Sequence, residues 1–140
     1  MIPMTQPYPG DYRGLPRIEY APHPGHLPDP GEVVWAWVPY EEDHRQGKER
    51  PVLIIGRDEP WLLALGLTSQ DHDRDHAQEA REGRYWIDVG IGEWDSRRRP
   101  SEARVNRIIR VDPEQTRGAG VRLDEQRFRA VAAAVRSHLK

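Results

Sequence analysis

Three apolar segments in the first half of the chain predict buried β-strands. Residues 32–38 are mostly β-branched or aromatic on both faces and end at Pro39, which is typical of a strand covered on both sides. Residues 52–56 have the length and composition of a short buried strand, and residues 61–67 form a third apolar run that ends on two hydroxyl residues. Polar or turn-forming residues separate these segments, so we expect short connections between neighbouring strands.

The second half of the chain predicts two more strands. Residues 85–89 alternate between apolar and polar positions, as in a half-buried strand. A further strand is predicted over residues 102–111. On a regular strand, Arg104 and Arg110 would share one face and Arg107 would lie on the other.

Helical signals are confined to the C-terminal part of the chain. Residues 112–115 predict a short helical turn with Pro113 at the first helical position. After a possible cap at Asp124, apolar residues recur at helical spacing from Phe128 to Leu139 and predict one amphipathic helix. About five strands and one terminal helix, without β-α-β alternation, indicate a mainly β (α+β) fold, either a small antiparallel barrel or a strongly twisted sheet.

The first thirty residues differ in composition from the rest. They hold 8 of the 13 prolines and few aliphatic residues, too little apolar surface to offset the entropy of ordering. We expect residues 1–30 to form an extended, mobile arm, with a segment draped over the domain or a partner as the alternative. Residues 31–140 are expected to form one domain.

Composition excludes several classes of protein. No apolar run approaches the ~20 residues that span a bilayer, and the first residues lack the basic start and apolar stretch of a secretory signal. We therefore expect a cytoplasmic protein without a membrane partner. The chain has no cysteine, which removes disulfides, thiolate metal sites and cysteine nucleophiles. Carboxylate, histidine, hydroxyl and guanidinium chemistry remains.

Charge is distributed unevenly behind a formal net charge of -2. Residues 97–110 hold six arginines and one acid, whereas residues 71–82 hold five acids and two arginines. Guanidinium groups bind phosphate in a bidentate manner and stay charged at any working pH. The basic stretch is compatible with a nucleic-acid partner, although a solvated arginine face is the more common outcome for such a run.

Two histidines four residues apart, His72 and His76, would share a face of a helix at a spacing that suits a divalent metal. The surrounding segment is polar throughout and offers no third ligand at a recognisable interval, so a solvated acidic loop is favoured. A phosphohydrolase signature in the same string would need a helical scaffold that the chain has no room for. We therefore predict neither a metal nor any other cofactor.

A phosphate site is suggested by two strand ends. Arg50 and Pro51 lead into one buried strand, and Thr68 and Ser69 end the next. If the two strands are antiparallel neighbours, the hydroxyl pair lies beside the guanidinium. Cleavage of RNA without a metal requires a stabilised pentavalent phosphorane, and arginine and threonine can supply the charge and hydrogen bonds for it.

The ordered set of motifs resembles the MazF/PemK family of toxins from type II toxin–antitoxin systems. It consists of GEVVWAWVPY at 31–40, GKERPVLII at 47–55, LTS at 67–69 and ARVNRIIRVD at 103–112. The resemblance covers roughly residues 31–139. It implies an SH3-like barrel with a C-terminal helix, a homodimer with an RNA groove at its interface, and an antitoxin peptide that inhibits the toxin in that groove. It also implies a growth-inhibiting, metal-independent, sequence-specific endoribonuclease that leaves 2′,3′-cyclic phosphate and 5′-hydroxyl ends.

The same resemblance assigns site residues. The family's catalytic arginine and threonine fall on Arg50 and Thr68. The expected RNA-binding residues, from the family's motifs and from the arginine-rich stretch, are Gln46, Lys48, Pro51, Ser69, Arg97, Arg98, Arg99 and Arg107.

Three departures from the family pattern leave other functions open. One extra residue separates Gly47 from Arg50, the pair Asn106-Arg107 stands where many relatives have Asp-Gln, and a polar insertion between Ser69 and Tyr85 would border the groove. One alternative is a noncatalytic SH3-like barrel that binds protein or nucleic acid. Another is a toxin of related fold that poisons a protein target such as gyrase.

Overall fold

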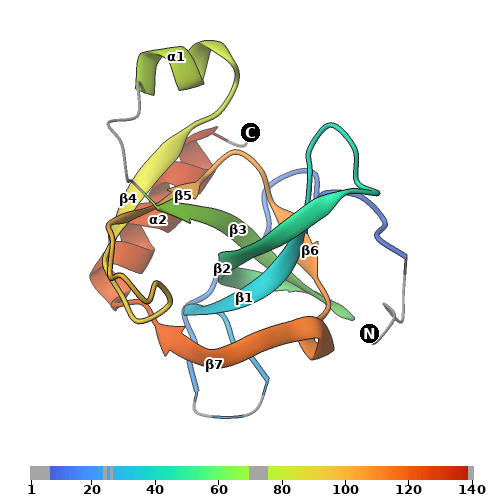
Figure 1. The fold of residues 1–140 in the computed structure, drawn as a ribbon, viewed down its shortest axis with the longest axis vertical. Helices are drawn as coiled ribbons and strands as arrows, with labels where there is room; N and C mark the ends of the chain where they lie inside the picture. The colour runs from blue at the N-terminus through green and yellow to red at the C-terminus, as the bar shows by residue number, and fades with distance from the viewer. Residues whose placement is uncertain (1–6, 24, 26, 70–75, 139–140) are drawn as a thin grey trace.

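The computed structural model describes residues 7–23, 25, 27–69 and 76–138. Its elements are β1 (Glu32–Pro39), β2 (Gly47–Asp58), β3 (Trp61–Ser69), α1 (His76–Arg81), β4 (Trp86–Gly90), β5 (Ser101–Arg104), β6 (Ile109–Val111), the 3-10 helix η1 (Pro113–Gln115), β7 (Thr116–Arg122) and α2 (Glu125–His138). Figure 1 shows α2 beside the β4 and β5 end of the sheet, with α1 projecting beyond it. Neither α-helix of the described ranges has the length and apolar character needed to cross a membrane.

The strands form one curved antiparallel sheet in the order β4-β5-β3-β2-β1-β7, with β6 beside β3. Strand β3 changes partner along its length: Leu62 faces Val111 of β6, whereas Thr68 faces Glu102 of β5. Within the described residues no pairing joins the two ends of the sheet, so it stays open. The expected mainly β class with one C-terminal helix is confirmed.

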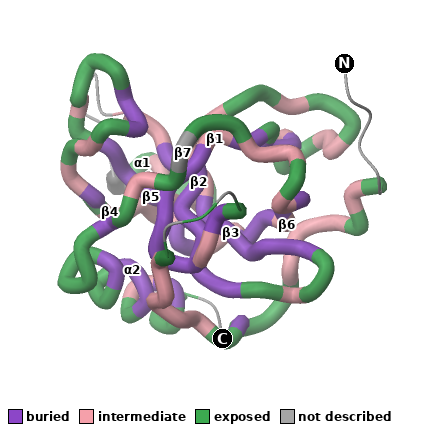
Figure 2. Tube along the Cα trace, turned by 90° about the horizontal axis from the view of Figure 1, so that it is seen from below, coloured by how far each residue is buried: buried purple, intermediate pink, exposed green. Residues whose placement is uncertain are grey.

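Both faces of the central strands are buried, which explains why their sequences are apolar throughout. Alternate residues of β2 and β3, such as Leu53 and Leu65, pack in the cluster that includes Phe128 of α2. The intervening residues, such as Ile54 and Leu62, pack in a second cluster on the other face. Figure 2 shows this buried centre under an exposed periphery. Each fully buried aliphatic side chain contributes about 1.5–3 kcal/mol of transfer free energy.

Most predicted elements occur where the sequence indicated them. The residue before η1, Asp112, accepts a hydrogen bond from the backbone N–H of Glu114 at 3.0 Å, as its capping position predicts. Strand β2 begins at Gly47 rather than at residue 52, because its polar first part pairs with the end of β1. Strand β7 and helix α1 were not predicted.

The strand predicted over residues 102–111 is wrong as a continuous element. It is two strands, β5 and β6, with a turn between them. The backbone N–H of Val105 donates to the carbonyl of Tyr85 at 2.9 Å, and the Asn106 amide donates to the carbonyl of Gly83 at 2.6 Å. These bonds hold Val105 and Asn106 beside the residues that precede β4, and the chain then forms β6 farther along β3. The expected sharing of one strand face by Arg104 and Arg110 therefore does not hold.

The described part of the N-terminal arm lies against the domain. The backbone N–H of Tyr12 donates to the carbonyl of Ile108 at 2.9 Å, and the Tyr20 hydroxyl donates to the carbonyl of Leu123 at 2.6 Å. A Cβ atom on Gly56 would lie 2.6 Å from the carbonyl oxygen of Arg17, so glycine is required where the arm crosses β2. These contacts correspond to the draped alternative, and the boundary at residue 30 stays a prediction.

Candidate functional site

Two neighbouring pockets open where the pairing between β2 and β3 ends. The first has a volume of about 320 Å³ and the second about 250 Å³. Arg50, Leu67 and Thr68 line both of them. The residues at the junction of the pockets are therefore the arginine and the threonine that the sequence motifs single out.

Strand register explains how Arg50 and Thr68 come together. The β2–β3 ladder begins with Val52 facing Gly66. Arg50 and Thr68 each lie two residues beyond that pair, so the antiparallel register continued outward sets them opposite one another. Proline at position 51 has no N–H for a ladder bond, and the strands separate there. On the other edge of β2, Arg50 faces Ala36 of β1.

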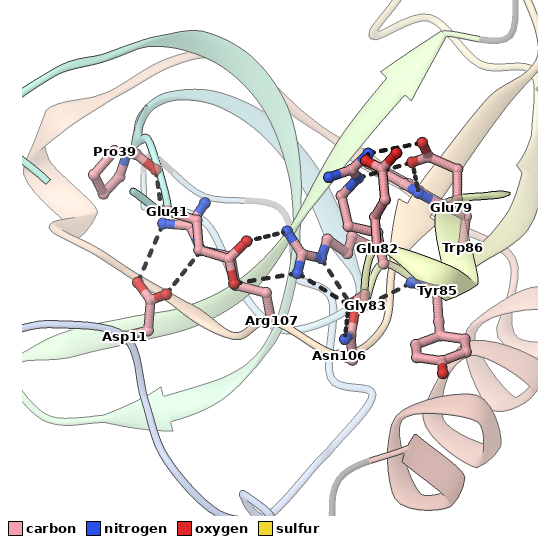
Figure 3. Close-up of polar contacts among 12 residues, drawn as sticks. Asp11, Pro39, Glu41, Glu79, Glu82, Gly83, Tyr85, Trp86, Asn106 and Arg107 are labelled. Carbon is pink, nitrogen blue, oxygen red and sulfur yellow. Dashed lines mark hydrogen bonds and ion pairs between the residues drawn. The ribbon is translucent and has the colours of Figure 1, made fainter. Parts of the chain in front are cut away.

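Arg104 and Arg107 form one wall of the first pocket, and each is paired with an acid from outside the sheet. The Arg104 guanidinium donates to both carboxylate oxygens of Glu41, at 2.9 and 3.2 Å. The Arg107 guanidinium donates to Asp11 of the arm at 2.8 Å and to the carbonyl of Pro39 at 2.7 Å (Figure 3). Both arginines are largely buried.

Burial alone would raise the pKa of Asp11, but hydrogen bonds from Arg107 and Tyr8 outweigh it and lower the pKa below its usual value. The Asp11 carboxylate is therefore ionised at neutral pH and neutralises Arg107. The arm thus neutralises one arginine that lines the pocket.

The opposite wall belongs to the polar insertion between β3 and β4. Glu79 of α1 accepts two hydrogen bonds of 2.9 Å from Arg84 and one of 2.9 Å from the indole N–H of Trp86. Hydrogen bonds from Arg84 to Glu79 and Glu82 raise the pKa of the guanidinium above its ordinary value. Glu79 and Arg84 of the insertion line the first pocket together with Trp86 of β4. That the insertion borders an RNA groove stays a prediction.

The second pocket has aromatic side chains and a buried acid. The Trp35 indole N–H donates to the carbonyl of Trp94 at 2.9 Å, and the Trp94 indole N–H donates to the Ser101 hydroxyl at 3.0 Å. Burial would raise the pKa of Asp95, but a 2.9 Å hydrogen bond from Arg99 helps to lower it below its usual value. Trp94 is buried and the Arg117 guanidinium lies over the Trp35 ring, so both indoles shape the pocket.

The predicted RNA-binding residues divide into two groups. Lys48, Pro51, Ser69 and Arg99 line the second pocket, and Arg107 lines the first. The other three, which line neither pocket, are Gln46, Arg97 and Arg98.

Gln46 donates to Asp43 at 3.2 Å in the β1–β2 connection, and Arg97 and Arg98 are exposed on the loop after β4. For the histidine pair, His72 lies outside the described residues, and the side chain of His76 is not described.

Sequence reasoning missed five charged residues of the first pocket. They are Glu41, Glu42, Glu79, Arg84 and Arg104. Only the arginine-rich composition of residues 97–110 pointed toward one of them, because the acids come from segments whose position depends on tertiary contacts.

Comparison with known families shows which family the chain belongs to. The family described as PemK-like, MazF-like toxin of type II toxin-antitoxin system matches residues 29–139. The chain belongs to this family. A search among curated proteins gives no match. In this PemK/MazF-like toxin the match begins at residue 29, so Asp11, which holds Arg107, lies outside the family region.

Proposed function

We propose that this toxin is a metal-independent, sequence-specific endoribonuclease that inhibits growth by cutting RNA at a phosphate held between Arg50 and Thr68. The observation that carries the proposal is that these two residues line both pockets. A phosphate bound at their junction has one pocket on each side of it. Family membership supports the toxin role, and the pocket geometry supports a polymeric substrate.

The chemistry proposed is transesterification. The 2′-hydroxyl of the substrate loses its proton to water as its oxygen attacks the adjacent phosphorus. The bond to the 5′-oxygen of the next nucleotide breaks as that oxygen takes a proton from water, leaving a 2′,3′-cyclic phosphate and a 5′-hydroxyl. The Arg50 guanidinium stabilises the negative charge of the phosphorane, and the Thr68 hydroxyl donates a hydrogen bond to a phosphate oxygen. We assign Arg50 electrostatic stabilisation rather than proton abstraction, because guanidinium does not lose its proton in proteins.

We also propose the assembly that family membership suggests. The toxin would form a homodimer in the cytoplasm, and a cognate antitoxin would bind it and block access to the pockets. Of the predicted RNA-binding residues, Lys48, Pro51, Ser69 and Arg99 are supported by their place in the second pocket.

The test is a cleavage assay in chelator with antitoxin-free protein and a long, unstructured RNA, with every new end mapped and its chemistry determined. Arg50→Ala is expected to lower the cleavage rate about 10²–10³-fold, the cost of removing one transition-state donor. Thr68→Val keeps the side-chain shape and is expected to lower the rate through loss of the hydroxyl.

Two matched controls exclude general damage. Arg57→Ala removes an arginine of the same strand that pairs with Asp29 at 2.7 Å, and Thr116→Val removes a hydroxyl from β7; neither residue lines the two pockets. Both controls are expected to cut like the wild type. Intact RNA with folded wild-type protein would reject the nuclease and favour the noncatalytic binding module.

A further inference from the structure

Arg104 and Glu41 form an ion pair in which the cation is buried and the acid is exposed. The Arg104 side chain is 12% exposed, whereas the Glu41 side chain is 53% exposed. Both terminal nitrogens of the guanidinium donate to Glu41, and the remaining Nε donates to Asn106 at 3.1 Å. One terminal nitrogen also lies 3.4 Å from the carbonyl of Gly83, but the anionic partner of the guanidinium is Glu41, a side chain from the surface loop between β1 and β2.

Arg104 belongs to the same pocket wall as the proposed cleavage site. Thr68 faces Glu102 on β5, and Arg104 lies two residues further along, on the same face of that strand. Gly66 occupies the corresponding position on β3, and a Cβ atom added to it would meet nothing within 4 Å. The space between Thr68 and Arg104 is thus open.

Two other arginines of this pocket, Arg84 and Arg107, are held differently. The acid that pairs with Arg84, Glu79, is only 14% exposed and also accepts from Trp86. The acid that pairs with Arg107, Asp11, also accepts a hydrogen bond of 2.6 Å from the Tyr8 hydroxyl. Displacing either acid would break further buried hydrogen bonds, so these two pairs are structural.

The Glu41 contact lacks such support. Glu41 accepts from no second donor among the described residues, and solvent already screens its exposed carboxylate, so releasing it breaks only the bonds to Arg104. A buried guanidinium nevertheless needs an anionic partner at all times. Phosphate offers the same bidentate oxygen geometry as a carboxylate and can replace it.

We propose that Arg104 is a phosphate-binding residue of this site and that Glu41 is its resident counterion, which a phosphodiester of single-stranded RNA displaces on binding. The inference rests on the proposed RNA substrate and extends it to a second phosphate contact beside the one at Arg50 and Thr68. Glu41 then weakens RNA binding, because each binding event first breaks the ion pair.

The experiment measures binding without cleavage. A short single-stranded RNA with every 2′-hydroxyl methylated is titrated with full-length protein at several salt concentrations, and affinity is followed by fluorescence anisotropy. Glu41→Gln is expected to tighten binding about tenfold, because the guanidinium is left ready for phosphate. It is also expected to steepen the salt dependence by about 0.7 in log–log slope, one extra released counterion.

Glu42→Gln is the matched control. Glu42 adjoins Glu41 and lines the same pocket, but its described contacts include no ion pair. The Glu42→Gln substitution removes one negative charge next to the same pocket. Its effect on RNA affinity therefore measures only the change in the overall electrostatic potential of the pocket. In an Arg104→Gln background, the excess effect of Glu41→Gln over Glu42→Gln is expected to vanish. Arg104→Lys keeps the charge but not the bidentate guanidinium, and in this background part of the excess effect of Glu41→Gln is expected to remain. Thermal unfolding verifies that each variant is folded.

The proposal is overturned if Glu41→Gln and Glu42→Gln have equal effects, if the excess persists without Arg104, or if the RNA does not bind. Tightening seen only with a glutamate-rich peptide would overturn it too and would assign Arg104 to a protein partner. The cleavage assay separates the two proposals. If the wild type cuts RNA but Glu41→Gln does not tighten RNA binding more than Glu42→Gln, only the second phosphate contact is rejected. If Glu41→Gln tightens binding in this way but the wild type does not cut RNA, the nuclease is rejected and the contact is kept.

Discussion

Replacing Tyr20 by alanine is expected to destabilise the whole domain, although Tyr20 lies in the proline-rich arm. Its ring packs against Phe128 with centroids 5.1 Å apart, and its hydroxyl donates to the carbonyl of Leu123. Truncating a fully buried aromatic residue costs about 3–5 kcal/mol. Tyr20 is half-buried, so we expect roughly half of that for the ring and about 1 kcal/mol for the hydrogen bond, giving about 3 kcal/mol for Tyr20→Ala. Tyr20→Phe keeps the ring and is expected to cost only about 1 kcal/mol.

Urea unfolding of the full chain at pH 7 measures these differences from the transition midpoint and slope. Leu15→Ala is the matched control, because Leu15 belongs to the same arm but is 49% exposed, and its loss is expected to change stability by less than about 0.5 kcal/mol. If Tyr20→Ala unfolds within the same margin of the wild type, the arm is not docked through Tyr20. In that case docking of Tyr20 is not what holds Asp11 of the arm beside Arg107.

Two further predictions concern the first pocket. Gly66→Val places a side chain in the open space beside Thr68 and is expected to lower RNA cleavage about tenfold or more while leaving the urea midpoint nearly unchanged; wild-type cleavage would show that no substrate group enters there. Because the pKa of Asp11 is lowered by folding, its pairing with Arg107 stabilises the protein above the unfolded pKa and this stabilisation is lost as pH falls through the folded pKa. Asp11→Asn is therefore expected to be less stable than wild type at pH 7, with the difference shrinking on acidification; a difference independent of pH would contradict the pairing.

The predictable parts of the fold are those in which local pattern and burial agree. Strands β1 and β3 are buried on both faces, so continuous apolar runs identify them, and α2 places Phe128 and Val135 on one side of a helix, so helical spacing identifies it. Strand β7 was missed because its residues are small or polar, and it forms by backbone pairing with β1, for instance Val121 beside Val33. The turn after β5 was missed because the atoms that cause it, the carbonyls of residues 83 and 85, are distant in sequence.

The same distinction applies to the site. The proximity of Arg50 and Thr68 could be predicted from the sequence, because neighbouring antiparallel strands align their ends. The acids that neutralise the pocket could not, because Asp11, Glu41 and Glu79 come from three segments outside the sheet. Loop and arm positions depend on contacts such as that of Tyr20, which composition does not reveal.

The pairing of Arg107 with Asp11 has a consequence for how this toxin varies among its relatives. One partner lies inside the family region and the other in the arm that precedes it. Since a buried guanidinium without its carboxylate is strongly destabilising, neither residue can mutate first without loss. The two positions are therefore expected to be inherited together, and lineages that shed the arm are expected to replace this arginine with an uncharged residue.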